Sequence, residues 1–263
     1  MTPDEVKKVV GNTPGMALDQ GRVISAFIHA NNPATVLELG FYHGVSSCYM
    51  AAALAEIGAG PLVTIDNESA LTRKPFIADL LARCGLSSLV QFWCEPTSYT
   101  WRLMRFLEQD PRPRFDLCYI DGAHTWFVDG FAFFLVDRLL RPGGWVIFDD
   151  LDWTWARSPS SRDTEGVRRM PRDERETPQV ALVYDLLVKP HPNYGRFEVS
   201  KGWAYAQKLG PESGPMHVKR EVVYTDLRSI AAKVKHRTLQ LLRALREWSA
   251  RKPKTPNRAG SQM

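Results

Sequence analysis

The chain has 263 residues, of which 44% are hydrophobic and 24% are charged, as in an ordinary globular protein. No apolar run reaches the length of a membrane span, and the opening MTPDEVKKVVGNTPG lacks the apolar core of a signal peptide. The four cysteines form no CxxC pair, which argues against a zinc site or a disulfide framework. We therefore expect a cytoplasmic protein.

The net charge of +5 is unevenly distributed along the chain. From His217 to the end, twelve Lys and Arg stand against three Asp and Glu, and the other residues carry 22 basic and 26 acidic side chains, a net of −4. The body is mildly acidic, which argues against nucleic acid as a partner.

Helices and strands are expected to alternate through the first part of the chain. Two helices, Asp4–Val10 and Leu18–Ala30, form an N-terminal segment over residues 1–33. The expected strands that follow are Thr35–Leu39, Leu62–Ile65, Leu89–Cys94, Phe115–Ile120 and Trp145–Phe148, and the helices between them are Ser46–Ile57, Lys74–Arg83, Ser98–Glu108 and Thr125–Leu140. Alternation at this spacing predicts an α/β fold, a doubly wound parallel sheet with helices on both faces.

The pattern changes after Asp150. Residues Trp153–Pro178 are polar and rich in arginine, too long for a plain connection, and we expect a lid or insertion. Gln179–Val188 is an expected helix, and Arg196–Lys208 is an expected antiparallel hairpin around Lys201–Gly202. The central domain, residues 34–210, should therefore hold a mostly parallel seven-stranded sheet that ends in an antiparallel hairpin.

The basic segment 211–263 is expected to contain an amphipathic helix, Leu227–Trp248, followed by a disordered tail. The apolar stripe of this helix must be buried against the body, a second subunit or a membrane surface. We expect the body or a homo-oligomer, because such a helix most often packs on protein. Basic residues on its other faces would suit an anionic membrane instead.

Two short apolar stretches end on acids. Phe115–Ile120 runs into Asp121, and Trp145–Phe148 runs into Asp149 and Asp150, with Pro142–Gly144 expected to end the helix between them. The strands of such a βαβ unit are parallel and adjacent, so all three acids should lie at the carboxyl edge of the sheet, where open α/β folds bind ligands. Three crowded carboxylates repel one another, and a hard divalent cation would relieve this.

His124 follows Asp121 by three residues and could be aimed at the same point. A metal and a base that converge there could activate a hydroxyl group. A structural His124, and Asp149 and Asp150 as helix caps, are the plainer alternatives. Nearby tryptophans could line a pocket or belong to the core; they are Trp126, Trp153 and Trp155.

The first expected strand ends in Glu38-Leu39-Gly40-Phe41-Tyr42-His43-Gly44. Its glycines permit a sharp turn and a close approach to a ligand, although the dinucleotide pattern G-x-G-x-x-G is absent. Asp66 ends the second strand and could accept the hydroxyls of a ribose, or could cap a helix.

The segments VLELGFYHG, VTIDNE, FDLCYIDGAH and LLRPGGWVIFDD, in this order, resemble the landmark segments of class I S-adenosylmethionine-dependent methyltransferases. The resemblance covers about residues 34–208 and implies a Rossmann-like fold with the terminal hairpin. The GAH and FDD details are similar to the metal-dependent O-methyltransferases that modify sugars, the macrocin and mycinamicin type.

The resemblance implies roles for particular residues. The methionine end of S-adenosylmethionine would lie on the loop with Gly40, Phe41 and Gly44, with Glu38 beneath it. The remaining cofactor contacts would come from Asp66 at the ribose, from Glu95 near the adenine and from Asp121. Mg²⁺ would be bound by Asp121, Asp149 and Asp150, and His124 would be the general base.

The implied activity is methylation of a hydroxyl on a small-molecule acceptor, such as a sugar, a glycoside or another natural product. Two alternatives keep the same fold: a metal-independent methyltransferase, and a catalytically inactive cofactor-binding protein that works through its basic tail. A nucleic-acid methyltransferase is disfavoured, because the chain lacks the N/D-P-P-Y/F motif of amino-directed enzymes.

Overall fold

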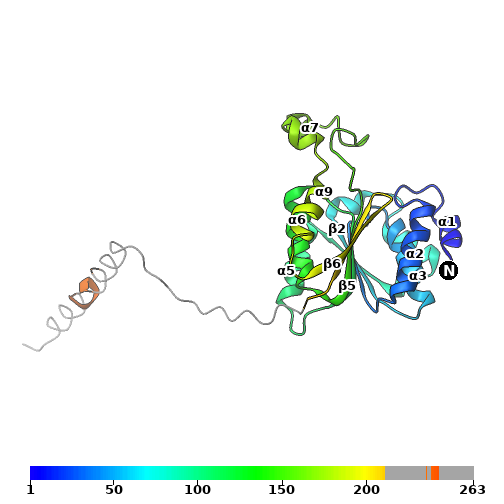
Figure 1. Cartoon of the computed structure of the whole chain (residues 1–263), viewed down its shortest axis with the longest axis horizontal. Helices are drawn as coiled ribbons and strands as arrows, with labels where there is room; N and C mark the ends of the chain where they lie inside the picture. Colours follow the sequence, from blue (N-terminus) through cyan, green and yellow to red (C-terminus); the bar gives the residue numbers. More distant parts are fainter. Residues whose placement is uncertain (211–234, 236–237, 243–263) are drawn as a thin grey trace, which may run out of the picture. The chain divides into compact units, whose positions relative to one another are not determined.

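The computed structural model describes residues 1–210, 235 and 238–242 (Figure 1). The chain divides into two units, Met1–Gly214 and Pro215–Met263. The expected helix Leu227–Trp248 lies almost entirely outside the described residues, of which Lys235 and residues 238–242 are helical. The placement of that helix therefore stays a prediction.

The first unit is built on one seven-stranded sheet of order β3-β2-β1-β4-β5-β7-β6. Neighbouring strands are parallel from β3 to β5, and β7 runs antiparallel to both of its neighbours, as expected from the sequence. The strands are β1 Val36–Leu39, β2 Leu62–Asn67, β3 Val90–Glu95, β4 Phe115–Ile120, β5 Leu140–Phe148, β6 Tyr194–Ser200 and β7 Trp203–Lys208.

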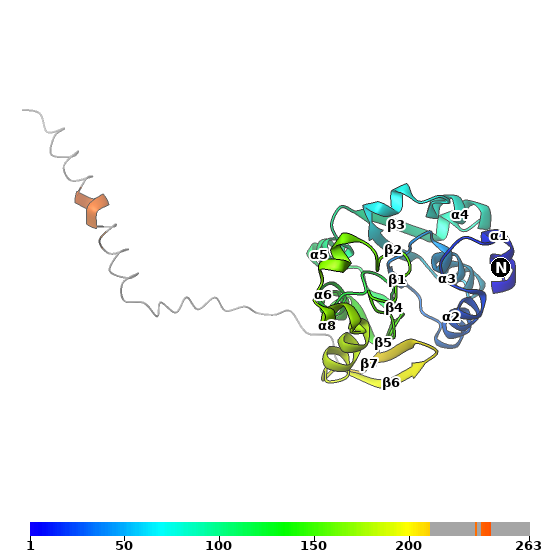
Figure 2. The ribbon, with the colours of Figure 1, turned by 90° about the horizontal axis from the view of Figure 1, so that it is seen from above.

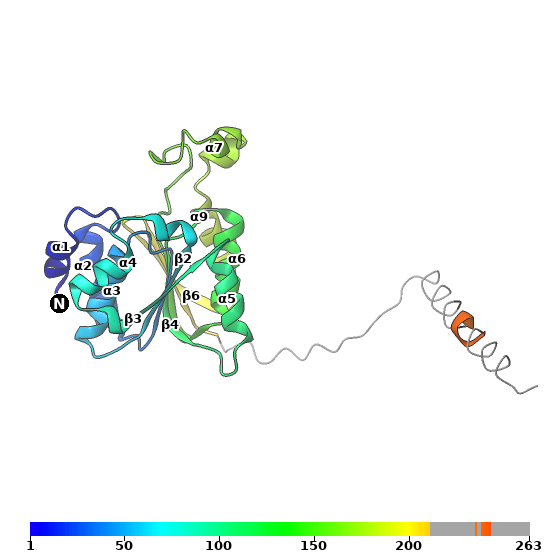
Figure 3. The same cartoon turned by 180° about the vertical axis from the view of Figure 1, so that it is seen from behind.

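Helices cover both faces of the sheet (Figures 2 and 3). One core lies under α1 Pro3–Val10, α2 Leu18–Asn31, α3 Val45–Glu56 and α4 Ile77–Cys84, and the other under α5 Tyr99–Glu108, α6 Trp126–Asp137 and α9 Gln179–Val183. The short helical turns are η1 Glu68–Thr72, η2 Ser87–Leu89 and η3 Tyr184–Val188. Because helices cover both faces of the sheet, every residue of β1 is buried.

The segment Pro142–Gly144 departs from its predicted role. It was expected to end a helix, but α6 already ends at Asp137 and the residues Pro142–Gly144 lie inside β5. Leu140 is fully buried beside Phe115, and the register then shifts before Trp145 pairs with Leu117. This bulge accommodates Pro142, which has no N–H for the ladder.

The segment between Trp153 and Pro178 contains two short helices, α7 Glu165–Arg169 and α8 Arg172–Glu176, and projects from the carboxyl edge of the sheet (Figure 1). Gln179, just after it, fixes its base. The side chain of Gln179 accepts a hydrogen bond from the Trp126 amide (2.7 Å) and donates one to the Glu174 carbonyl (3.1 Å).

The terminal hairpin contacts the rest of the domain at both ends of β7. Trp203 packs against the ring of Tyr119, with centroids 5.4 Å apart, and the Leu151 amide donates to the Gly202 carbonyl (3.1 Å). The buried ammonium of Lys208 donates to the carbonyls of Asp137 (2.5 Å) and Leu140 (3.2 Å), which closes the end of α6. Among the described residues, no helix is long and apolar enough to cross a membrane.

Candidate active site

The loops after β1 and β4 touch at the carboxyl edge of the sheet. Gly40 has a φ of 88°, and a Cβ atom there would lie 1.9 Å from the carbonyl oxygen of Asp121. Only glycine fits, both because of the positive φ and because of this contact. The glycine loop and the first acid of the predicted metal site are therefore held against one another.

Glu38 lies beneath the glycine loop and is fully buried. Its carboxylate accepts hydrogen bonds from the hydroxyls of Ser46 (2.5 Å) and Ser47, in the first turn of α3. Burial raises the pKa of Glu38 to about 7, although the serine hydrogen bonds lower it. Glu38 thus ties β1 to α3 and supports the loop from below.

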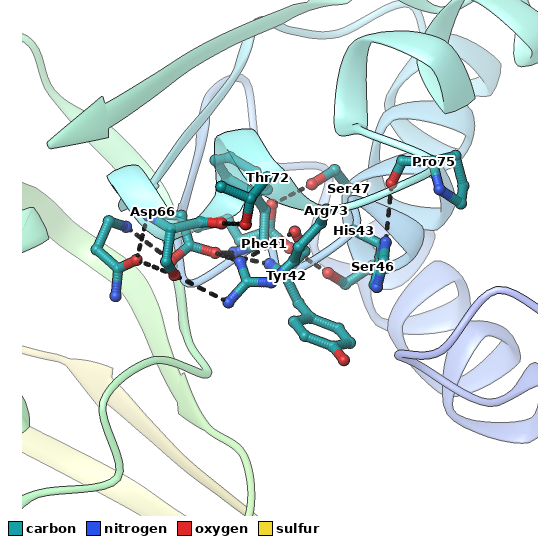
Figure 4. Close-up of polar contacts among 12 residues, drawn as sticks. Phe41, Tyr42, His43, Ser46, Ser47, Asp66, Thr72, Arg73 and Pro75 are labelled. Atoms are coloured by element: carbon teal, nitrogen blue, oxygen red, sulfur yellow. Dashed lines mark hydrogen bonds and ion pairs between the residues drawn. The ribbon is translucent and has the colours of Figure 1, made fainter. Parts of the chain in front are cut away.

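Asp66 joins the end of β2 to the same loop (Figure 4). Its Oδ2 atom accepts hydrogen bonds from the amides of Phe41 (3.2 Å) and Tyr42 (2.8 Å) and lies 3.4 Å from the Arg73 guanidinium. Arg73 also lies over the Tyr42 ring, 4.5 Å from its centroid. Burial raises the pKa of Asp66, while the amides and Arg73 lower it.

Two aromatic residues of the glycine loop face protein. The side chain of Phe41 is buried and packs against Phe76 and Phe92, so only its backbone is available to a ligand. The Nδ1 atom of His43 lies 2.8 Å from the Pro75 carbonyl oxygen (Figure 4). This contact holds the loop against the segment that leads into α4.

A cavity of about 90 Å³ opens beside this loop, between the ends of β2, β3 and β4. Its lining residues are Asp66, Asn67, Thr97, Ser98, Tyr99, Gly122, Ala123 and Val128. Asp66, predicted to hold a ribose, lines this cavity. Glu95, predicted to lie near an adenine, is buried and paired with Arg102, whose Nη2 and Nε atoms lie 2.5 and 2.6 Å from Oε1.

Asp121, His124 and Asp150 come together at the same edge. Nε2 of His124 lies 3.4 Å from Oδ1 of Asp121 and 3.0 Å from Oδ2 of Asp150. One ligand atom from each of the three residues lies within 4.8 Å of the others, close enough to hold one metal ion. The carboxylates are 30% and 44% exposed, so solvent and small ligands can reach them.

Asp149 is turned away from this group. Its carboxylate accepts hydrogen bonds from the Tyr119 hydroxyl and from the Asp150 amide (2.6 Å), and only 7% of the residue is exposed. Burial and the charge of Asp121 raise the pKa of Asp149 to about 7. The three acids predicted as ligands are neighbours, but only Asp121 and Asp150 face His124.

The charge state of His124 reflects the two carboxylates. Burial lowers the pKa of this imidazole, but the close carboxylates of Asp121 and Asp150 raise it to about 10. The ring stacks on Trp153, with centroids 4.7 Å apart, and Trp153 meets Trp155 edge-on at 4.8 Å. Both tryptophans therefore belong to the site, whereas Trp126 is 39% exposed on α6.

The sequence did not single out Tyr99, Asp129, Tyr119 or Arg73. Tyr99 and Tyr119 act on site residues from elements distant in the chain, so no local motif marks them. Arg73 and Asp129 lie only seven and four residues from their partners Asp66 and Thr125, but outside the four landmark segments. Asp129 carried one usable signal: an acid in the first turns of a helix often binds amides just before that helix.

Residues 37–151 match a protein-family model described as a methyltransferase domain. No curated protein matches the chain significantly. Several solved structures match it over most of its length. The O-methyltransferase TomG from Streptomyces achromogenes, involved in tomaymycin synthesis and bound to S-adenosylmethionine, is 20% identical, with a TM-score of 0.56 over 79% of this chain and 89% of TomG.

Two further structures contain S-adenosylhomocysteine. The O-methyltransferase from Bacillus cereus is 21% identical, with a TM-score of 0.54 over 78% of this chain and 90% of its own. The methyltransferase PaMTH1 from Podospora anserina is 16% identical, with a TM-score of 0.55 over 78% of this chain and 86% of PaMTH1. The chain thus has the Rossmann-like fold of these structures, and residues 37–151 of it match the methyltransferase-domain model.

Proposed function

We propose that this protein is an S-adenosylmethionine-dependent O-methyltransferase that acts on a hydroxyl of a small molecule with the help of a divalent cation such as Mg²⁺. The observation that carries the proposal is the position of His124. It lies between Asp121 and Asp150, and its own loop lines the cavity beside the glycine loop through Gly122 and Ala123.

The residues of the cavity suit the cofactor. Asp66 can accept hydrogen bonds from ribose hydroxyls at its Oδ1 atom, which accepts only from the Asn67 amide among the described residues. A ribose hydroxyl could also displace the Arg73 guanidinium from the Oδ2 atom. The methionine end would lie against the loop between Gly40 and Gly44, which Asp66 orders through hydrogen bonds from the amides of Phe41 and Tyr42. S-adenosylmethionine bound there would supply an electrophilic methyl group on a sulfonium.

The exposed carboxylates of Asp121 and Asp150 supply the oxygen atoms that Mg²⁺ prefers. Bound there, the cation would lower the pKa of a hydroxyl that it ligates. Asp149, held by Tyr119, would then position the backbone of Asp150 through its amide.

His124 would hold and release the proton of the acceptor hydroxyl. As an imidazolium paired with two carboxylates, it cannot accept a proton near neutral pH. If both carboxylates were shared with a cation, their effect on the pKa of His124 would fall, and burial would favour the neutral imidazole. Trp153 keeps the ring oriented by stacking.

Support for the acceptor class comes from two tryptophans near the acids: Trp153 stacks on His124, and Trp155 meets Trp153 edge-on. Sugar and phenol rings pack on aromatic faces. TomG belongs to the synthesis of a natural product, tomaymycin. The acceptor would therefore be a sugar, a glycoside or a related natural product, and the segment Trp153–Pro178 would exclude water above it.

A metal-independent methyltransferase of the same fold is the second candidate. It is favoured by the ion pairs that already offset part of the negative charge of the site: one imidazolium lies between the two carboxylates of Asp121 and Asp150. In that case the three residues would position the acceptor by hydrogen bonding alone.

One experiment separates these candidates. Purified protein is incubated with methyl-labelled S-adenosylmethionine and a panel of diols, glycosides and catechols, with EDTA and then with Mg²⁺ restored. We expect label transfer to an acceptor hydroxyl that stops with EDTA and returns with Mg²⁺. Full turnover in EDTA would support the metal-independent enzyme, and absent S-adenosylhomocysteine binding by calorimetry would refute both.

A further inference from the structure

The loop Asp121–Thr125 joins β4 to α6 and carries two of the three clustered residues. His124 within it has a φ of 54°, in the left-handed region that non-glycine residues seldom adopt. A loop with such a residue needs support from its surroundings to keep one conformation. The support comes from two buried side chains outside the loop, Tyr99 at the start of α5 and Asp129 in α6.

Tyr99 and Asp129 bind the backbone of the loop on either side of His124. The Tyr99 hydroxyl accepts a hydrogen bond from the Ala123 amide (3.2 Å) and donates one to the Asp129 carboxylate. The other oxygen of Asp129 accepts from the Thr125 amide (2.9 Å). The two residues are only 5% and 1% exposed, so water does not compete for these bonds.

The ring of Tyr99 also fixes the loop by contact. A Cβ atom at Gly122 would lie 2.5 Å from the Tyr99 ring, which shows how closely the loop backbone rests on it. Tyr99, Gly122 and Ala123 line the cofactor cavity as well. One buried tyrosine therefore lies between that cavity and the backbone that sets the direction of His124.

We infer that Tyr99 and Asp129 are positioning residues: they fix His124 and Asp121 relative to Asp150 and to the cofactor cavity. The catalytic meaning of this inference rests on the proposed methyltransferase function, but the effect on the loop does not. Without the two side chains the loop would relax, and Nε2 of His124 would leave its place between the carboxylates.

The first test measures the loop itself. Amide hydrogen exchange by NMR is compared in the wild type, Tyr99→Phe, Asp129→Ala and Asp129→Asn. We expect exchange of the Ala123 amide to accelerate about tenfold in Tyr99→Phe, and of the Thr125 amide in Asp129→Ala, because each loses its acceptor. Asp129→Asn keeps one acceptor oxygen, which can serve the Thr125 amide while the new NH2 group donates to the Tyr99 hydroxyl, so exchange at Thr125 should stay near the wild type.

The matched control is Tyr184→Phe. The Tyr184 hydroxyl is likewise buried and donates to a backbone carbonyl, that of Tyr205 (2.7 Å), but it does not contact the loop. Its removal should leave exchange at Ala123 and Thr125 unchanged. If Tyr99→Phe and Asp129→Ala exchange like the wild type at these amides, the positioning role is wrong.

The second test is kinetic. Displacing a reacting group by about 1 Å can reduce the rate about 10²-fold. We expect Tyr99→Phe to lower kcat about 10- to 10²-fold and to change the Kd of S-adenosylhomocysteine less than about threefold, with Asp129→Asn close to the wild type. Equal losses in kcat and in affinity would make Tyr99 a cofactor-binding residue instead, and an unchanged kcat would remove the role.

Failure of the proposed function gives a different pattern. A wild type that binds no S-adenosylhomocysteine and turns over no acceptor would refute the methyltransferase, while the exchange experiment would still decide whether the two side chains hold the loop. If Tyr99→Phe does not fold, the loop can be tested by comparing Asp129→Ala with Asp129→Asn in the same two experiments.

Discussion

The hydroxyl of Tyr119 donates a hydrogen bond to the carboxylate of Asp149, and this contact separates Asp149 from Asp150, the next residue. Both acids follow the end of β5, and Asp150 has a φ of 57°, in the left-handed region, so its side chain leaves the backbone in a different direction from that of Asp149. Asp149 is nearly buried, whereas 44% of the Asp150 side chain is exposed beside His124. The two acids therefore differ in what they can bind.

We expect Asp149 and Asp150 to differ in how much each contributes to cation affinity. Asp121→Asn and Asp150→Asn should each weaken Mn²⁺ binding, measured by EPR, by about 10²-fold or more, and Asp149→Asn by about tenfold or less, as for a group that supports a ligand. All three variants should fold, because asparagine keeps the size and shape of the aspartate that it replaces. An equal loss in Asp149→Asn would restore the three-carboxylate site that the sequence predicts.

His124 should make the stability of the chelated protein depend on pH. Its pKa is raised from 6.5 to about 10 in the fold, so its ion pairs stabilise fully below pH 6.5 and are lost as the pH rises toward 10. In EDTA, the stability advantage of the wild type over His124→Gln should shrink by more than about 1 kcal/mol between pH 7 and 10. Urea unfolding measures this, and a constant difference would argue against the ion pairs.

Glu38→Gln tests the acid beneath the glycine loop. The pKa of Glu38 is raised from 4.5 to about 7, so the protonated form is the one that the fold favours, and this contribution is lost as the pH rises from 4.5 through 7. Between pH 5 and 8, the wild type should lose about 2–3 kcal/mol relative to Glu38→Gln. Parallel pH profiles for the two proteins would show that Glu38 is ionised throughout.

Asp66→Ala should weaken S-adenosylhomocysteine binding by roughly 1–3 kcal/mol through lost hydrogen bonds to the ribose. Calorimetry measures the effect. Arg73→Gln is the matched control, because it removes the ion pair and leaves the carboxylate, and its affinity should stay within about threefold of the wild type. A comparable loss in Arg73→Gln would mean that the pair, and not Asp66 alone, holds the ligand.

Gly40→Ala should be among the most damaging single substitutions in the domain, because its Cβ would meet the Asp121 carbonyl at 1.9 Å. Gly58→Ala is the control: Gly58 also has a positive φ, 68°, but nothing lies within 4 Å of a Cβ there. We expect Gly58→Ala to lose about 1–2 kcal/mol and Gly40→Ala several times more, by urea unfolding. Similar losses would show that the loop can move away from Asp121.

The sequence predicted the sheet well because each apolar stretch ends on a distinctive polar residue. Phe115–Ile120 followed by Asp121 is an example, since both the strand and the edge at which its acid lies follow from the pattern. The hairpin of β6 and β7 was equally clear from Lys201–Gly202 between two predicted strands. Pro142–Gly144 was misread because a bulge and a helix end use the same residues.

Long-range contacts explain what the sequence could not predict. Whether Asp149 faces a ligand depends on Tyr119, thirty residues earlier, and the tilt of the His124 loop depends on Tyr99. Such pairs have no fixed spacing, because they are set by how neighbouring strands and helices pack. Trp153 was likewise undecided until its ring was seen to stack on His124.

The contacts at the two ends of β7 have a consequence for engineering this domain. Trp203 touches Tyr119 behind Asp149, and Lys208 closes the helix whose opposite end follows His124. A saturation library restricted to residues near the acids would therefore miss positions that constrain them. We expect Trp203 and Lys208 to tolerate few replacements, while the exposed Arg196 and Glu198 on the neighbouring strand accept many.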